Sequence, residues 1–120
     1  MSTRLIGEIM FSQRLREETD QAHERASGHR FMAAMLDGSL GAHGFTRYLA
    51  ALVPIYDALE GAMRRSEDSS VAVFDHRALD RSARLRADLV ALGGPDYPAS
   101  TAGTAYAEAV ADCADSPHRL

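Results

Sequence analysis

The sequence predicts an all-α fold. Apolar residues recur at steps of three and four along most of the 120 residues, and no stretch alternates apolar and polar residues for long enough to predict a strand. Most turn-forming residues are gathered in short breaks between these periodic segments. With 46% hydrophobic and 25% charged residues, the composition is that of a globular protein with a packed core, and the length suits one domain.

Five helices are expected, of which the first two are amphipathic and close in sequence. The first begins after Ser12, which can act as an N-cap, and ends at Gly28. Its stripe of apolar and small residues follows helical spacing: Leu15, Thr19, Ala22 and Ala26. A short second helix is expected over about residues 29–36, and Asp37-Gly38 supplies its C-terminal break.

The third helix, over residues 42–65, has the clearest pattern. Its apolar stripe repeats at helical spacing without interruption: Phe45, Leu49, Leu52, Tyr56, Leu59 and Met63. A fourth helix is expected over about residues 76–92, with Asp75 as its cap and Gly93-Gly94-Pro95 as its end. The fifth, over about residues 100–114, carries small side chains on the stripe expected to face inward, which favours close packing: Ala102, Tyr106, Ala109 and Cys113.

Composition also limits the partners. The 13 basic residues are all arginines and are outnumbered by 17 acidic ones, and the net charge of −4 argues against a nucleic-acid-binding module. A single cysteine, Cys113, cannot form an internal disulfide, which favours a reducing compartment such as the cytoplasm. The first residues lack the continuous apolar stretch of a signal peptide or membrane span, so no membrane partner is expected.

His23 is the histidine best placed for chemistry, because it lies within a well-formed helix, about 60–70° from the centre of the apolar stripe. The residues four before and four after it are Thr19 and Ser27, so the spacing of a zinc-binding helix is lacking. A haem needs only one axial histidine from the protein, since the porphyrin supplies four nitrogens. Arg16 lies two turns earlier on a similar face and can pair with a propionate. On periodicity alone, a hydrogen-bonded boundary histidine and a solvated arginine remain the plainer interpretations.

The stretch from Leu15 to Arg64 resembles the N-terminal part of the haem oxygenases, the biliverdin-forming enzymes of bacteria and animals. The resemblance includes the first-helix histidine, the break at Gly38, and the segment I-Y-D-A-L-E at residues 55–60, which is similar to the family's I-Y-x-A-L-E. Further matches are Phe31-Met32, Phe45 and Tyr48-Leu49. It continues to Gly93-Gly94-Pro95 and more faintly through Tyr106, so it spans nearly the whole chain.

The resemblance implies a haem-oxygenase-like helical bundle in which His23 is the axial ligand to haem iron. Arg16 then matches a basic position that meets a haem propionate, and Thr19, Ala26 and Met32 fall at positions that touch the porphyrin. The implied reaction is oxidative cleavage of haem to biliverdin, carbon monoxide and ferrous iron. Haem is both substrate and cofactor, and the electrons come from an external donor such as a ferredoxin or a reductase.

Two features depart from the family pattern. The family often has a carboxylate four residues after the ligand, where this chain has Ser27. The G-D-x-x-G-G pattern of the family's distal helix does not occur. The sequence therefore predicts a single haem-oxygenase-like domain over residues 1–120 that is truncated before the distal helix. Three interpretations stay open: a haem oxygenase, a non-catalytic haem-binding module, and a helical fragment that self-associates through the surface left open.

Overall fold

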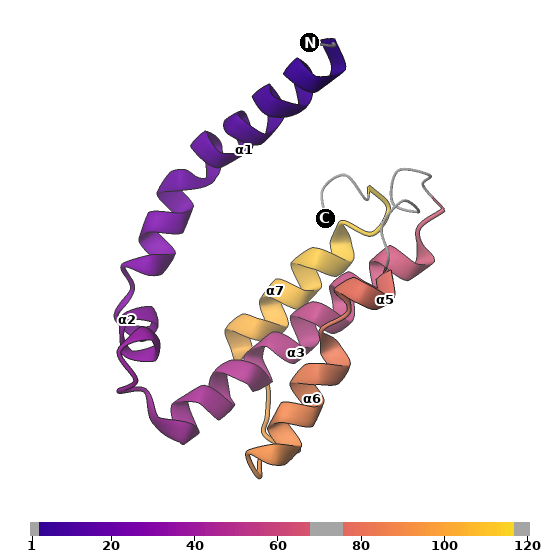
Figure 1. Ribbon diagram of the computed structural model, residues 1–120. Helices are drawn as coiled ribbons and strands as arrows, with labels where there is room; N and C mark the ends of the chain where they lie inside the picture. The colour runs from indigo at the N-terminus through magenta and orange to yellow at the C-terminus, as the bar shows by residue number, and fades with distance from the viewer. Residues whose placement is uncertain (1–2, 68–75, 117–120) are drawn as a thin grey trace. The chain divides into compact units, whose positions relative to one another are not determined.

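The computed structural model describes residues 3–67 and 76–116, and throughout these ranges the regular structure is helical (Figure 1). The all-α prediction is therefore confirmed. The helices are α1 (Thr3–Ser27), α2 (Arg30–Leu36), α3 (Gly41–Arg65), α5 (His76–Leu79), α6 (Ser82–Ala91) and α7 (Thr101–Asp112). They belong to two compact units, Met1–Leu40 and Gly41–Leu120.

The first unit is built on α1, which begins at Thr3, so the predicted start after Ser12 is wrong. Gly7 costs a helix only about 1 kcal/mol relative to alanine, too little to stop it. Side-chain hydrogen bonds between residues one turn apart stabilise the helix: Gln13 donates to Glu17 at 3.0 Å and Arg14 to Glu18 at 2.7 Å. From Met10 onward every side chain of α1 is exposed.

The short helix α2 follows a tight turn and lies close to its predicted range. His29 is its N-cap, and the Nδ1 of this residue accepts a hydrogen bond from the Phe31 N–H at 3.2 Å. The helix ends at Leu36, Asp37 is its C-cap, and Gly38 then turns the chain with a φ of +80°, a backbone conformation that favours glycine. The break predicted at Asp37-Gly38 is confirmed.

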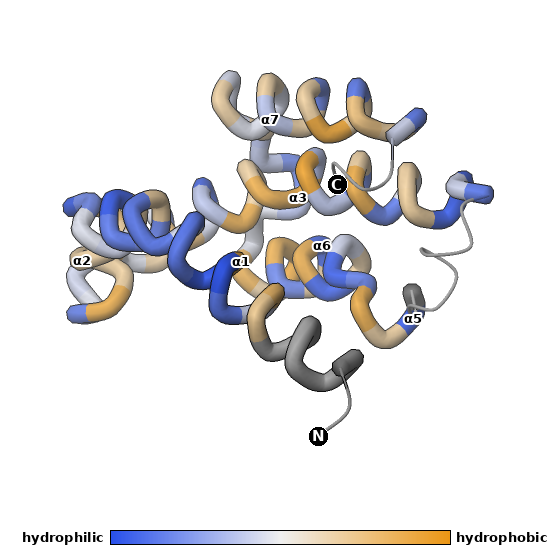
Figure 2. Tube along the Cα trace, turned by 90° about the horizontal axis from the view of Figure 1, so that it is seen from above, coloured by the Kyte–Doolittle hydropathy of each residue, from blue (hydrophilic) through white to orange (hydrophobic). Residues whose placement is uncertain are grey.

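In the second unit α6 and α7 both pack on α3 (Figures 1 and 2). The buried core consists of Leu49 and Ala50 from α3 with Leu85 and Leu89 from α6. Partly buried hydrophobic residues surround it: Tyr48, Leu52, Val53, Tyr56 and Tyr97. The predicted stripe of α3 is thus largely buried or half-buried, apart from Phe45, which is 38% exposed.

The predicted fourth helix is two helices, because the chain breaks at Asp80 and Arg81 between α5 and α6. Both residues are held by α3: Asp80 pairs with Arg64, and the Arg81 N–H donates to the Glu60 carboxylate. The proposed cap, Asp75, lies outside the described residues. At the other end α6 stops as predicted, since Gly93, with a φ of +76°, lets the Gly94 N–H reach the Leu89 carbonyl at 2.9 Å.

Helix α7 packs through a different face from the one predicted. Gly103 is buried and Ala107 and Val110 are half-buried, whereas Tyr106, assigned to the inner stripe, is 60% exposed. Gly103 determines which face packs on α3, because a Cβ atom at this position would collide with the backbone of Ala51. The expectation of close packing by small side chains is thus correct for α7, but on a neighbouring stripe.

Helices α1 and α3 each have 25 residues, enough to reach across a bilayer. Neither of them, nor any other helix in the described part of the chain, contains a stretch apolar enough to do so.

A polar network joins α3 to α6 beside the core. The Asp57 carboxylate accepts two hydrogen bonds from the Arg86 guanidinium and one from the Ser82 hydroxyl. The bond from Arg86 Nη1 to Asp57 Oδ1 is 2.9 Å long. The hydrogen bond from Arg86 has the largest effect and lowers the pKa of Asp57, and the bond from Ser82 lowers it further. Partial burial acts in the opposite direction but is outweighed, so the pKa stays below its usual value of 3.8. In turn, the hydrogen bond with Asp57 raises the pKa of Arg86.

Replacing Asp57 with asparagine is expected to lower the free energy of unfolding by about 1 kcal/mol at neutral pH, since a paired arginine is left without its carboxylate. Because the pKa of Asp57 is lowered on folding, its contribution is complete above the unfolded value of 3.8 and is lost as the pH falls through the folded pKa. Urea unfolding at a series of pH values should show the difference shrinking in acid. Asp96→Asn serves as the exposed control, and a pH-independent difference would contradict the assignment.

Candidate functional site

Four of the five predicted haem-contacting residues share one face of α1. Arg16, Thr19, His23 and Ala26 fall within an arc of about 80° at 100° per residue. Arg16 and His23 stand two turns apart, about 10 Å along the axis at 1.5 Å per residue. All four side chains are exposed, so α1 presents them on an open helix face.

The His23 imidazole lies at the C-terminal end of this face. Its Nδ1 is 3.4 Å from the Ser27 hydroxyl oxygen, one turn later. Within the described residues its Nε2 makes no hydrogen bond, and neither does the Arg16 guanidinium. The Thr19 hydroxyl donates to the Leu15 carbonyl at 2.8 Å, so its proton is used within the helix. The face therefore offers one imidazole nitrogen and one guanidinium to a ligand.

The fifth residue, Met32, lies on α2 in the same compact unit. The chain reaches it through the turn at Gly28 and His29, where the His29 N–H donates to the Ala26 carbonyl at 3.3 Å. Met32 and the adjacent Phe31 are half-buried, in contrast to the exposed side chains of α1. The structure thus gathers four predicted residues on α1 and places Met32 on the following helix.

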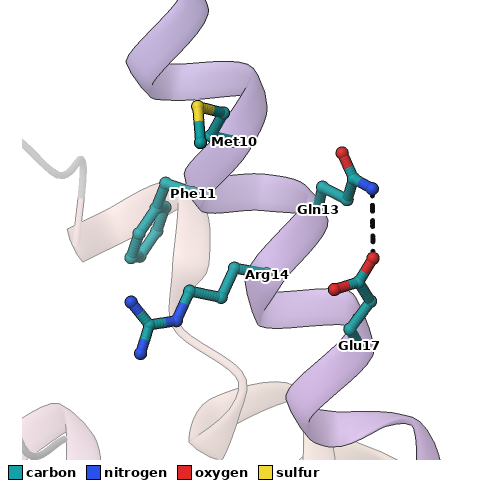
Figure 3. A pocket seen from close by; sticks show the side chains of 5 residues that line it. All are labelled: Met10, Phe11, Gln13, Arg14 and Glu17. Atoms are coloured by element: carbon teal, nitrogen blue, oxygen red, sulfur yellow. Dashed lines mark hydrogen bonds between the residues drawn. The ribbon is translucent and has the colours of Figure 1, made fainter.

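A surface hollow lies nearer the N-terminus of α1, apart from the predicted haem residues (Figure 3). The described residues that line it all come from this one helix: Met10, Phe11, Gln13, Arg14 and Glu17. Side chains from one helix form a single wall, and two of these, Gln13 and Glu17, are already hydrogen-bonded to each other. The hollow is therefore a poor alternative to the face that carries His23.

Comparison with known proteins decides the family. The sequence model of the heme oxygenase family matches residues 9–119, which include all five predicted haem-contacting residues. The chain belongs to the heme oxygenase family. It is 32% identical over 87 residues to "Heme oxygenase 2" of Synechocystis and 35% identical over 88 residues to human "Heme oxygenase 1". It is also 34% identical over 76 residues to a rice protein named "Probable inactive heme oxygenase 2, chloroplastic".

These similarities cover most of this chain but a minor part of each relative. The Synechocystis and human matches each take in 72% of this chain, and they take in 35% and 31% of the respective relatives. The rice match takes in 61% of this chain and 23% of the relative. This heme oxygenase family member thus spans about a third of the length of the first two. No solved structure matches the chain.

The residues of the α1 face suit the haem that the family name implies. A porphyrin fills four coordination positions of its iron, so one unengaged imidazole nitrogen is enough from the helix. An unengaged guanidinium suits a propionate carboxylate, and Thr19 and Ala26 add small side chains to the same exposed face. No group of three or more metal-binding side chains occurs among residues 3–67 and 76–116, so His23 has no competing metal cluster there.

Two features next to the site were not predicted as such. Ser27 contacts His23, whereas in the sequence Ser27 stands out only as a departure from the family pattern. The spacing of four residues, which brings side chains together on one helix face, is the signal that could have predicted this contact. His29 is the N-cap of α2: its Nδ1 accepts a hydrogen bond from the Phe31 N–H, which leaves the proton of the neutral ring on Nε2. The polar position just before a short amphipathic helix is the signal for that role.

Proposed function

We propose that this chain provides the haem-binding face of a haem oxygenase and that residues 1–120 belong to one haem-oxygenase-like domain. His23 binds the haem iron through Nε2, and Arg16 pairs with a propionate. Thr19, Ala26 and Met32 contact the porphyrin. The observation that carries the proposal is the unengaged Nε2 of His23 on an exposed face with Arg16, inside the region that matches the family.

In the proposed reaction haem is the substrate, and it also supplies the iron at which dioxygen is activated. The products are biliverdin, carbon monoxide and ferrous iron, and electrons come from an external donor such as a ferredoxin or a reductase. The contribution of this chain would be to hold the haem in place: His23 would bind its iron, and Arg16 would pair with a propionate. A lone cysteine and an acidic composition support a cytoplasmic setting without nucleic-acid partners.

A second candidate is a non-catalytic haem-binding module. Two observations favour it: the described side chains of α1 form an exposed face, and one relative is named as a probable inactive heme oxygenase. Haem held by one exposed wall loses less apolar surface to burial and binds more weakly than haem enclosed on both sides. The two candidates share the ligand and differ only in turnover.

Titration of the purified chain with haemin tests the shared part of both candidates. A saturable complex is expected, and His23→Ala should weaken it at least tenfold, or about 1.4 kcal/mol, and abolish the axial-histidine absorption spectrum. His43→Ala is the matched control, because it removes another exposed imidazole, from the second unit. Equal binding by the two variants would contradict the site and favour a helical fragment that takes up haemin unspecifically or self-associates.

Turnover then separates the candidates. With a ferredoxin, its reductase and NADPH, an enzyme converts the bound haem to biliverdin, which is identified by mass spectrometry. Catalase is included so that haem destruction by free peroxide is not mistaken for turnover. Haem that remains intact under these conditions, in a complex that still depends on His23, identifies the non-catalytic module.

A further inference from the structure

The α1 face that carries His23 and Arg16 offers half of the contacts that one haem can make. Within the described residues this face has one imidazole whose Nε2 makes no hydrogen bond, and one guanidinium that makes none. Haem iron can take a protein ligand on each side of the porphyrin plane, and the ring carries two propionates on one edge. One copy of the face therefore leaves one axial position and one propionate unmatched.

Two copies of the face match a haem both in number and in symmetry. A rotation of 180° about the line that runs through the iron and between the propionates exchanges the two sides of the ring. The same rotation exchanges the two propionates. Two chains related by this rotation would bring one His23 to each side of the iron and one Arg16 to each propionate. Identical chains associate most often through a two-fold axis of this kind.

The exposure of α1 suits a shared ligand. From Met10 to Ser27 every side chain of the helix is exposed, and Thr19 and Ala26 add small side chains beside His23. The net charge of −4 on each chain opposes the association of ligand-free copies. Two iron–imidazole bonds and two arginine–propionate pairs would then have to hold the copies together, so their assembly depends on haem.

We propose that two copies of this chain share one haem between their α1 faces. His23 of each copy is an axial ligand of the iron, and Arg16 of each copy pairs with one propionate. This inference rests on the proposed role of His23 as the ligand. A haem bound in this way has no iron position left for dioxygen. The shared complex therefore carries haem without cleaving it, and cleavage requires that one copy first leaves the iron.

The stoichiometry of binding tests this proposal directly. Haemin is added to the full chain at a chain concentration well above the dissociation constant, and the Soret band is followed. The absorption change should end at one haemin for two chains, with the low-spin spectrum of an iron that has two axial histidines. Sedimentation equilibrium should give the mass of one chain without haemin and of two chains with it. One haemin for each chain, at the mass of a single chain, overturns the proposal.

Histidine variants identify the source of the second ligand. His29→Asn and His43→Ala each remove another exposed imidazole, and asparagine keeps an acceptor at the N-cap of α2. Both variants should keep the low-spin spectrum and the ratio of two chains to one haemin, and His23→Ala should lose both. If the low-spin spectrum disappears in His29→Asn or His43→Ala, the second ligand is not a second His23 and the proposal is wrong.

Arg16→Ala tests the second pair of contacts. Because two arginines act in one shared complex, its formation constant should fall about tenfold, which is about threefold for each exposed ion pair. Arg25→Ala is the matched control, since Arg25 is also exposed but lies nine residues later, on the opposite side of α1. An equal loss in the two variants contradicts the pairing of Arg16 with the propionates.

The same titrations separate this inference from the proposed function. If His23→Ala binds haemin as tightly as the wild type, the proposed function fails, and the shared complex fails with it. If the wild type forms a complex of one chain with one haemin that still depends on His23, the proposed function stands and the sharing of haem fails.

Discussion

Replacing Glu60 with alanine is expected to lower the free energy of unfolding of the chain by about 3 kcal/mol. The carboxylate of Glu60 is 8% exposed and accepts two backbone hydrogen bonds, from the Arg81 N–H at 2.5 Å and the Ser82 N–H at 3.0 Å. These donors form the N-terminus of α6, which has no capping side chain of its own. Alanine leaves both N–H groups without this acceptor, that of Ser82 buried and that of Arg81 partly buried.

The magnitude follows from charge and burial together. Hydrogen bonds to a charged acceptor contribute about 1.5–3 kcal/mol each, and the positive end of the α6 dipole adds to the attraction. Glu60→Gln keeps an acceptor oxygen and loses the charge, so a loss of about 1 kcal/mol is expected. For a chain whose buried core is small, 3 kcal/mol is a large part of a total stability of about 5–15 kcal/mol.

Urea unfolding followed by tyrosine fluorescence measures this loss in the right part of the molecule. All four tyrosines lie after residue 40 and therefore report on the unit that begins at Gly41. Glu67→Ala is the matched control, because Glu67 is exposed and follows the end of α3. If Glu60→Ala unfolds at the same urea concentration as Glu67→Ala, the carboxylate does not cap α6.

Glu60 also shows why part of the fold could not be predicted. The sequence indicates one continuous helix over 76–92, since apolar spacing and helix formers run through Asp80 and Arg81. The break depends on an acceptor that stands 21 residues away along the chain, on α3. Local periodicity contains no information about such a partner, whereas the strong apolar repeat of α3 depends only on its own residues and predicts that helix nearly to its ends.

The candidate site follows a similar division. His23 and Arg16 could be placed on one helix face from spacing alone, because helical geometry fixes their relative positions. The hydrogen bond from the Ser27 hydroxyl to the His23 carbonyl could not, since it depends on a side-chain rotamer that only coordinates provide. The start of α1 was misplaced for another reason: a serine that can cap a helix is also tolerated within one.

The face of α7 is the second large feature that spacing misassigned, and Gly103 provides its test. A Cβ on Gly103 would lie 2.5 Å from the Ala51 carbonyl oxygen and 3.2 Å from the Ala51 Cα. The obstruction is backbone within α3 and cannot rotate away as a side chain would. Alanine would favour the helix itself by about 1 kcal/mol, but α7 would have to move away from α3. Overpacking of this kind costs about 1–3 kcal/mol.

Gly103→Ala should therefore destabilise the chain by about 1–2 kcal/mol, and Gly103→Val by more, although both substitutions replace glycine within a helix. The control is Ala105→Gly, at an exposed position of the same helix, where only helix propensity changes and a loss of about 1 kcal/mol is expected. Unfolding in urea with tyrosine fluorescence measures all three variants. The sign at position 103 is decisive: if α7 packed through the predicted stripe, Gly103 would face solvent and alanine would stabilise the chain.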